Sequence, residues 1–335
     1  MHRNLKVFFA AFTGSVAVWW GINTLSMELE QFFFLRELYT NPELLAAASN
    51  TLELEQKLQD AYPLAKKKTA PLELQAASVL SLYAKESGPL RGEASATKVL
   101  FEKNSNTPLP IASITKLMTA LVAIKNYPLD QHITITPKVL ETPGEAGQLR
   151  AGEAFTVKDL LYLVLMESSN DAAEALAEAK EPKVFIGLMN EEAARLNLQN
   201  TSFVNPTGLD EAQYTNKSTT KDLAELARYL FQSYPQVFDI LSQSELALIT
   251  PTGRFHHTMR NTNELLGYYD WPGRTFGGKT GTTPLARETL LFVVESPDTQ
   301  GYIINVILGS EARFAEMRQL LQWILQSYQW KLTSP

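Results

Sequence analysis

A serine and a lysine three residues apart can act as a nucleophile and its base. In Ser113-Ile-Thr-Lys116 the two residues stand at the start of a segment, Leu117 to Lys125, whose composition favours a helix. Positions i and i+3 lie on the same face of a helix. A neutral lysine placed in this way can take the proton of the serine hydroxyl, and the serine can then attack a carbonyl carbon. The pattern therefore predicts acyl transfer that needs no histidine.

The same four-residue pattern occurs three times, at Ser95-Ala-Thr-Lys98, Ser113-Ile-Thr-Lys116 and Ser218-Thr-Thr-Lys221. A chain of this composition yields about one such match by chance. The first pair enters a predicted strand, in which positions i and i+3 point to opposite faces. The third pair fits the N-cap of a surface helix, with Asp222 in its first turn. The middle pair precedes a mostly apolar helix, whose N-terminal N–H groups would lie near the reacting centre.

Two later motifs can supply partners for such a pair. Ser168-Ser-Asn170 lies between two predicted helices, and on its own it is equally well explained as a capped helix junction. Lys279-Thr-Gly281 follows Gly277-Gly278 in a predicted strand. A lysine flanked by glycines in a strand indicates that a ligand or another backbone approaches closely. A twisted edge strand or a β-bulge is the alternative explanation.

The elements that must position these motifs alternate in type along the chain. Strands are expected at 76–83, 97–102, 275–283, 289–295 and 302–308. Helices are expected at 114–126, 157–167, 170–179, 184–196, 219–233 and 312–329. Strands at both ends would thus flank a helical insertion. The late strands are joined by short loops, which favours an antiparallel sheet. This is an α+β fold.

The three motifs together resemble a known family. Ser-x-x-Lys, a Ser-x-Asn-type motif and Lys-Thr-Gly, in this order, are typical of penicillin-binding proteins and class A β-lactamases. Ser218 follows Ser168, so it cannot be the nucleophile in that order. The segments 111–120, 168–177 and 189–210 are similar to the D-alanyl-D-alanine carboxypeptidases, the low-molecular-mass penicillin-binding proteins. The resemblance covers about residues 72 to 329. The middle motif departs from it, because Ser169 stands where the carboxypeptidases usually have glycine.

The resemblance implies a β-lactamase/transpeptidase-like fold and a role for each catalytic residue. Ser113 would be the acylated nucleophile, and Lys116 the base that activates it. Ser168 would relay a proton toward the leaving amine, and Asn170 would position Lys116 or the substrate amide. Lys116 must be neutral to act as a base, so burial and the charge of Lys279 are expected to lower its pKa.

The resemblance also implies how the substrate is held. Lys279 would supply positive potential, and the backbone N–H groups of Ser113 and Thr282 would form the oxyanion hole. Arg313, at the start of the last helix, matches a family position that helps bind the terminal carboxylate; an ordinary surface arginine is the alternative. The substrate-binding residues implied are Asn170, Lys279, Thr280, Gly281, Thr282 and Arg313.

The function expected from the resemblance is that of a serine-type D-Ala-D-Ala carboxypeptidase. It would remove the terminal D-alanine from peptidoglycan stem peptides, and β-lactams would acylate the same serine. No metal or organic cofactor is implied, and we interpret His256-His257 as a loop feature rather than a metal site. Three alternatives stay open: a D,D-endopeptidase that cuts peptidoglycan cross-links, a β-lactamase, and an inactive cell-wall binding protein.

The N-terminus predicts where the enzyme works. Val7 to Leu25 is an uncharged run long enough to cross a bilayer as a helix. Arg3 and Lys6 precede it, so the positive-inside rule leaves the N-terminus in the cytoplasm and the remainder outside. A cleaved signal peptide, which would make the protein secreted, is the alternative. The chain has no cysteine, so disulfides and thiolate zinc sites are excluded. Its net charge of −6 gives no support for nucleic-acid binding.

The domain organisation follows from these segments. We expect a membrane anchor at 1–26, a helical stalk at 27–71 and a peptidase domain at 72–330. Within the peptidase domain, a helical subdomain is expected at about 127–260.

Overall fold

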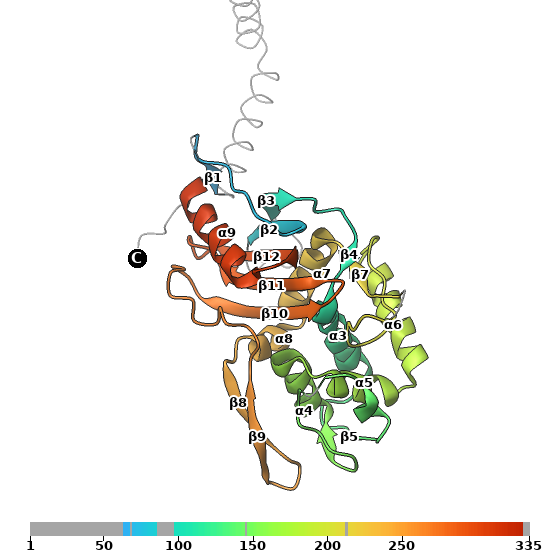
Figure 1. Ribbon diagram of the computed structural model, residues 1–335. Coiled ribbons are helices and arrows are strands. Elements are labelled where there is room, and N and C mark those ends of the chain that lie inside the picture. Colours follow the sequence, from blue (N-terminus) through green and yellow to red (C-terminus); the bar gives the residue numbers. More distant parts are fainter. Residues whose placement is uncertain (1–62, 68, 86–96, 145, 212–213, 331–335) are drawn as a thin grey trace, which may run out of the picture. The chain divides into compact units, whose positions relative to one another are not determined.

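The computed structural model describes residues 63–67, 69–85, 97–144, 146–211 and 214–330 (Figure 1). The predicted membrane anchor at 1–26, including the run at 7–25, lies outside the described residues, as do Ser95 and most of the predicted stalk. No helix among the described residues has the length and apolar character needed to cross a membrane. At the described end of the predicted stalk, β1 (Leu64–Ala65) is extended and pairs with β13 (Tyr328–Gln329).

The main sheet is antiparallel and has five strands in the order β10-β11-β12-β2-β3. Their bounds are Thr275–Thr283 for β10, Arg287–Glu295 for β11, Gly301–Ser310 for β12, Ser78–Lys85 for β2 and Thr97–Lys103 for β3. The predicted antiparallel sheet is thus confirmed, with strands from both ends of the described chain. The central strand β12 and its neighbour β2 carry almost unbroken runs of buried residues, which is typical of strands covered on both faces.

Helices cover this sheet and build a second region beside it (Figure 1). The last helix, α9 (Arg313–Ser327), packs on β11 and β12, and α7 (Thr220–Ser233) packs on β12 and β2. The other helices are α3 (Lys116–Asn126), α4 (Val157–Tyr162), α5 (Asn170–Glu178), α6 (Pro182–Arg195) and α8 (Pro235–Leu241). All the predicted helices are present, and α8 is an addition.

Two predicted helices contain turns of a different kind. The segment expected to begin as helix at 114 starts with the 3₁₀ turn η1 (Ala112–Thr115) and becomes α-helical at Lys116. The helix expected at 157–167 is α-helical only up to Tyr162, and its last five residues form the π-helical segment η3 (Leu163–Glu167). Such π segments occur often at functional sites.

The region expected to be helical also contains short strands. β8 (Glu245–Ile249) and β9 (Phe255–Arg260) form a hairpin, and His256-His257 lies on β9, so the interpretation as a loop feature is wrong. The turn sequence Thr250-Pro-Thr-Gly253 between them is the hairpin signal that the helical interpretation overlooked. The remaining two-stranded pairs are β4 (Leu109–Pro110) with β7 (Lys217–Ser218), and β5 (His132–Thr134) with β6 (Ala154–Thr156).

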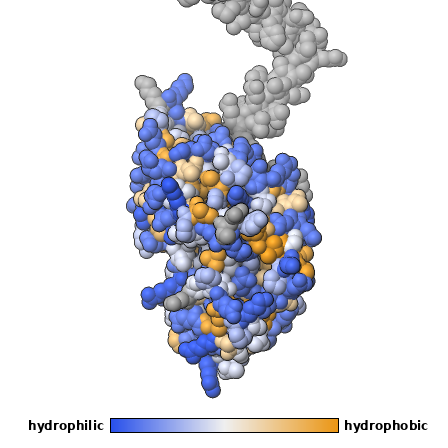
Figure 2. Space-filling view, turned by 45° about the vertical axis from the view of Figure 1, so that its right-hand side comes forward, coloured by the Kyte–Doolittle hydropathy of each residue, from blue (hydrophilic) through white to orange (hydrophobic). Residues whose placement is uncertain are grey.

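Helix α3 lies in the middle of the apolar core. Every residue from Lys116 to Ala123 is buried, and α3 contacts α5, α6 and α7. Full burial of one large apolar side chain stabilises a fold by about 1.5–3 kcal/mol. The face shown in Figure 2 is mainly hydrophilic, with hydrophobic side chains in small groups. The apolar helix therefore places Lys116 in the interior, although lysine is rarely buried.

Candidate active site

Ser113 and Lys116 meet at the start of α3. Lys116 is fully buried, and its Nζ lies 2.9 Å from Ser113 Oγ, 2.7 Å from Asn170 Oδ1 and 2.7 Å from the carbonyl oxygen of Thr207. The 3₁₀ turn places the serine one turn before the lysine on the same side of the chain. The structure thus joins the first motif, part of the second motif and a loop that none of the motifs contains.

These three contacts determine where the lone pair of Lys116 points when the amine is neutral, whereas a charged amine would donate to all three partners, Ser113 Oγ included. Nδ2 of Asn170 donates to the carbonyl oxygen of Pro143 at 2.7 Å, so Oδ1 is the atom that faces the lysine. This Oδ1 and the carbonyl oxygen of Thr207 can only accept, and they use two hydrogens of Nζ. A neutral amine has two hydrogens and one lone pair. The lone pair is then left for the hydroxyl of Ser113, which is the geometry of a base beside a nucleophile.

The electrostatics of the site favour the neutral amine. Burial lowers the pKa of Lys116 from 10.5 to about 7, while the carboxylate of Glu174 acts in the opposite direction. The charge of Lys279 was expected to contribute to this shift. In the structure, the repulsion acts on Lys279 itself, whose pKa is held well below its ordinary value by burial and then by Lys116 and Arg313. Burial and mutual repulsion thus act together against a charge on both ammonium groups.

The second motif forms the junction between η3 and α5. Ser168 ends η3 with a left-handed backbone, φ 62°, and Asn170 begins α5. Ser169, which stands where the related enzymes have glycine, is buried and caps α5 by accepting a hydrogen bond from the backbone N–H of Ala172 at 3.2 Å. The extra hydroxyl is therefore structural, and the motif is both a capped junction and a part of the site.

The third motif lies on β10, which pairs only with β11 within the main sheet and exposes its other edge to η1. A Cβ atom on Gly281 would lie 2.7 Å from the backbone nitrogen of Ser113. The glycine is thus required because the strand touches the turn that carries the nucleophile. Lys279 is fully buried, and its Nζ donates to the carbonyl oxygen of Thr280 at 3.0 Å. The two hydroxyl oxygens of Thr280 and Thr262 lie 2.6 Å apart.

Arg313 reaches the same strand from the first turn of α9. Its Nη1 donates to the carbonyl oxygen of Gly281 at 2.8 Å and to Oγ1 of Thr282 at 2.6 Å. Burial lowers its pKa, with Glu288 and Glu264 acting against this shift. These contacts place the guanidinium beside the third motif, and its role in binding a carboxylate stays a prediction.

A loop that sequence motifs did not assign to the site completes it. Asn205 to Asp210 passes over η1, and a Cβ atom on Gly208, whose φ is +87°, would lie 2.0 Å from the carbonyl oxygen of Ala112. Asn216 donates from Nδ2 to Thr115 Oγ1 at 2.9 Å and fastens this loop to the nucleophile turn. The sequence Asn-Pro-Thr-Gly was visible, but the acceptor for Lys116 is a backbone carbonyl, which no side-chain motif can reveal.

A cleft of about 580 Å³ opens beside these residues. Thr207 and Thr282 line one part of it, and Glu174 lies on its wall. Burial and the neighbouring Glu211 raise the pKa of Glu174 to about 7. The residues that line the cleft are Lys138, Glu141, Thr142, Pro143, Glu174, Thr207, Leu209, Asp210, Glu211, Thr282, Thr283 and Pro284. The cleft is large enough to receive part of a peptide.

Of the other two serine–lysine pairs, Ser95 lies outside the described residues, and Ser218 and Lys98 have partners of their own. Ser218 is buried in β7, and its Oγ lies 2.7 Å from Thr201 Oγ1. The N-cap of α7 is Thr219, so the prediction that Ser218 caps this helix is wrong by one residue. Lys98 donates to the carbonyl oxygen of Pro63 at 2.8 Å. Over the part of the chain that the structure describes, no group of three or more His, Cys, Asp or Glu side chains could hold a metal ion.

The sequence relatives of this chain are peptidases of one kind. Residues 90–312 match the peptidase S11 family, described as D-alanyl-D-alanine carboxypeptidase. The D-alanyl-D-alanine endopeptidase of Escherichia coli K12 is 33% identical over 222 residues, which span 64% of this chain and 69% of that protein. The carboxypeptidase DacC of E. coli K12 is 34% identical over 232 residues, which span 63% of this chain and 54% of that protein.

Solved structures show the same fold. The Streptomyces K15 DD-transpeptidase has a TM-score of 0.65 and 27% identity, and covers 77% of this chain and 100% of its own. Penicillin-binding protein D2 of Listeria monocytogenes, in a cefotaxime-bound form, has a TM-score of 0.63 and 28% identity, with 77% and 100% covered. Because the family match spans more than half of the sequence, this chain belongs to the D-alanyl-D-alanine carboxypeptidase family of serine peptidases.

Proposed function

We propose that this enzyme removes the terminal D-alanine from peptidoglycan stem peptides through an acyl-enzyme on Ser113. The observation that carries the proposal is the contact of Lys116 Nζ, whose two hydrogens are used elsewhere, with Ser113 Oγ at 2.9 Å. Lys116 accepts the hydroxyl proton while Oγ attacks the carbonyl carbon of the penultimate D-alanine. The backbone N–H groups of Ser113 and Thr282 stabilise the oxyanion, and loss of one such donor typically costs about 2.7–4 kcal/mol.

The tetrahedral intermediate then expels the terminal D-alanine. The leaving nitrogen takes a proton that Ser168 relays from Lys116, and an ester with Ser113 remains. Water attacks the ester while Lys116 accepts a proton from it, and the C–O bond to Ser113 breaks as Lys116 returns that proton to Oγ. Asn170 supports both steps because its Oδ1 accepts a hydrogen bond from Lys116 at 2.7 Å and holds the amine in place.

The carboxylate of the terminal D-alanine is proposed to bind between β10 and α9. Lys279, Thr280, Thr282 and Arg313 offer cationic or hydroxyl donors there. An anion in this position favours the charged form of Lys279 and raises its pKa. Substrate binding thus places the positive charge on Lys279, while burial keeps Lys116 neutral.

A D,D-endopeptidase is the second candidate. The observation in its favour is the similarity to relatives named D-alanyl-D-alanine endopeptidase, at 33% identity over 69% of the E. coli protein. The chemistry at Ser113 would be unchanged, and only the leaving group would differ. We keep the carboxypeptidase as the first choice because the matching family carries that description.

Labelling with a fluorescent penicillin tests the catalytic assignment. The full chain should form a covalent adduct, Ser113→Ala should abolish it, and Ser95→Ala should not, although Ser95 begins the same four-residue pattern. A labelled Ser113→Ala variant would overturn the assignment. Incubation with monomeric and cross-linked muropeptides separates the two candidates, because activity on the dimer alone would favour the endopeptidase.

For its location, we propose that residues 7–25 anchor the enzyme in the bacterial cell membrane with the catalytic unit on the cell-wall side. The support is the uncharged run preceded by Arg3 and Lys6. Fractionation should find the full chain with the membranes, and protease added outside the cytoplasmic membrane should digest it. Recovery of a shortened, unanchored chain would favour the cleaved signal peptide instead.

A further inference from the structure

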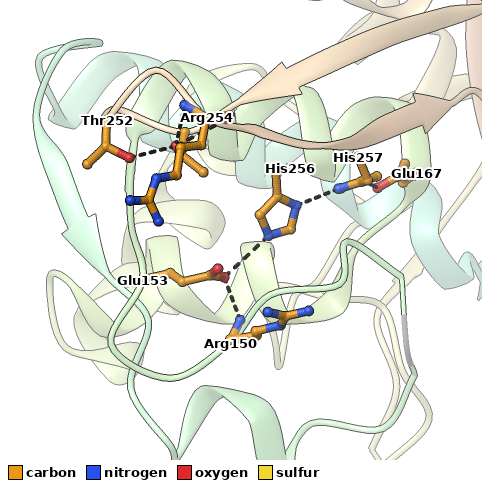
Figure 3. A network of polar contacts seen from close by, with 8 residues as sticks. Arg150, Glu153, Glu167, Thr252, Arg254, His256 and His257 are labelled. Atoms are coloured by element: carbon orange, nitrogen blue, oxygen red, sulfur yellow. Dashed lines mark hydrogen bonds and ion pairs between the residues drawn. The ribbon is translucent and has the colours of Figure 1, made fainter.

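Two histidines of the β8–β9 hairpin and two carboxylates of the neighbouring segment form a polar network (Figure 3). His256 Nδ1 lies 2.7 Å from His257 Nδ1. The outer nitrogens face carboxylates: Nε2 of His256 lies 3.4 Å from Glu153 Oε2, and Nε2 of His257 lies 2.9 Å from Glu167 Oε2. Both imidazoles are more than nine-tenths buried, with side-chain exposures of 9% for His256 and 7% for His257.

A β-bulge brings these consecutive side chains together. Along the hairpin, Ile249 pairs with Phe255 and Leu248 pairs with His257, so His256 is the extra residue. In a regular strand, neighbouring side chains point to opposite faces. A bulge changes the direction of one side chain and is often found next to an active site. The contact between the rings is therefore built into the backbone of β9.

The network contacts both ends of the segment that leads to Ser168, the serine proposed to relay the leaving-group proton. Glu153 lies just before β6, which runs directly into α4. Glu167 is the last residue of η3, and Ser168 follows it with a left-handed backbone. After β9, the backbone N–H of Thr262 donates to the carbonyl oxygen of Met166 at 3.1 Å. The hairpin and the residues just after it thus contact the segment 153–167 at both of its ends.

The number of protons in this network follows from its geometry. Carboxylate oxygens only accept hydrogen bonds, so both outer nitrogens must carry hydrogens. The contact between the two Nδ1 atoms needs one hydrogen, because one nitrogen must donate it and the other must accept it. Three hydrogens on four ring nitrogens correspond to a single positive charge shared by His256 and His257. A neutral pair loses one of the carboxylate contacts, and a doubly charged pair loses the contact between the rings.

We propose that His256 and His257 are positioning residues that share one proton and hold Ser168 in its catalytic place. The inference rests on the proposed function, since it concerns the serine that relays the leaving-group proton. The contacts of His256 and His257 with each other and with Glu153 and Glu167 form a clamp, which is complete only while the pair shares one proton. When the pair gains or loses a proton, the end of η3 is released, and acylation of Ser113 slows.

Charged groups of both signs surround the pair. Those drawn in Figure 3 are Glu153 and Glu167, which contact the imidazoles, together with Arg150 and Arg254. Arg150 donates its backbone N–H to Glu153 at 2.8 Å, and β8 presents the apolar Leu248 opposite His257.

The protonation state can be observed directly in the full chain. In protein labelled with ¹⁵N at histidine, nitrogens with and without a hydrogen resonate at well-separated shifts. The pair should show three protonated nitrogens over a plateau of pH. His132, which is exposed and lies outside the network, serves as the internal control. Two protonated nitrogens throughout the plateau would overturn the inference.

The link to catalysis is tested by the pH dependence of acylation with a fluorescent penicillin. An amide at position 153 can donate to Nε2 of His256, so in Glu153→Gln the neutral pair satisfies every contact. At a pH high enough to remove the proton that the pair shares, wild type should lose roughly tenfold in acylation rate, as expected for a misplaced catalytic group. Glu153→Gln should show no such loss. His257→Gln should be slow over the whole range, and His132→Gln should match wild type.

The outcomes separate the two proposals. If wild-type protein is not acylated at all, the proposed function fails and the clamp has no reaction to serve. If wild type is acylated but Glu153→Gln shares its alkaline loss, or His257→Gln keeps the wild-type rate and profile, the clamp is wrong while the proposed function stands. Circular dichroism of each variant shows whether it folds, and Glu153→Gln carries the test if His257→Gln does not.

Discussion

At the scale of single residues, the chemistry depends on the charge of one amine. Lys116 lies in an apolar helix, and burial lowers its pKa to about 7. Its two fixed acceptors, Asn170 Oδ1 and the carbonyl oxygen of Thr207, direct the remaining lone pair toward Ser113. The site therefore obtains its base from desolvation, which is the largest cause of the shift, rather than from a neighbouring positive charge.

The pH dependence of acylation follows from this pKa. Below about pH 7 Lys116 is protonated and cannot accept the proton of Ser113, so the rate should fall on the acid side. Glu174 raises the pKa of Lys116, so Glu174→Gln should move this acid limb to lower pH. Rates of penicillin acylation measure the shift, with the exposed Glu191→Gln as the control. A shift in the opposite direction would contradict the assignment of Lys116 as base.

The same residue makes stability depend on pH. The pKa of Lys116 is lowered in the folded chain, so between about pH 7 and 10.5 the unfolded chain binds one more proton than the folded chain. Stability relative to Lys116→Met should therefore rise with pH in this window, by at most about 1.4 kcal/mol per pH unit. Urea unfolding at several pH values measures the difference, and a constant difference would mean that the buried amine is charged.

At the scale of elements, the site is made by close contact between β10 and η1. The Lys279-Thr-Gly motif lies on a strand with a free edge, and Gly281 lets that edge touch the backbone of Ser113. The loop around Gly208 covers the same turn from another side. Each glycine is needed for a contact between backbones, so a substitution there changes the position of the nucleophile rather than its chemistry.

Gly281→Ala tests this contact. The added Cβ would lie 2.7 Å from the backbone nitrogen of Ser113 and 2.6 Å from Thr289 Oγ1, so the strand must move away. We expect the acylation rate to fall by roughly 10- to 100-fold. Gly187→Ala is the matched control, because its Cβ meets nothing within 4 Å in the helix α6. Equal rates for the two variants would show that β10 does not need to touch η1.

At the scale of the whole catalytic unit, distant parts of the chain close the fold. The strand β1 enters beside β13, and Tyr328 at the C-terminal end is buried and donates its hydroxyl to the carbonyl oxygen of Leu100 at 2.6 Å. This end of the sheet is far along the chain from the three motifs. Its role is to stabilise the sheet that carries β10.

Tyr328→Ala should therefore lower stability without altering the chemistry. Removal of a large buried aromatic side chain costs about 3–5 kcal/mol, and this tyrosine is 8% exposed. Tyr269→Ala should have little effect, because Tyr269 is 98% exposed. Thermal unfolding measures the loss, and the acylation rate at low temperature should stay near that of wild type. A large rate defect in folded Tyr328→Ala would link this end of the sheet to the site.

Much of the fold was predictable because local patterns agree with it. The apolar runs that became β2, β11 and β12 are read directly from side-chain type, and so are the helices with clear caps. The π-helical end at Leu163–Glu167 and the 3₁₀ turn at Ala112–Thr115 were not predictable, since hydrophobic periodicity does not separate these turns from an α-helix. The β8–β9 hairpin was missed because its turn signal was outweighed by the helices around it.

For the site, the amino-acid sequence by itself determined the groups that can react and their order along the chain: Ser113 with Lys116, then Ser168 with Asn170, then Lys279. Tertiary structure alone decided that the carbonyl of Thr207 and the amide of Asn170 take the hydrogens of Lys116. It alone paired His256 and His257 with Glu153 and Glu167. The physical reason is that residue type sets which protons a group can hold. The burial and the partners that select among those protons come from segments far apart in the chain.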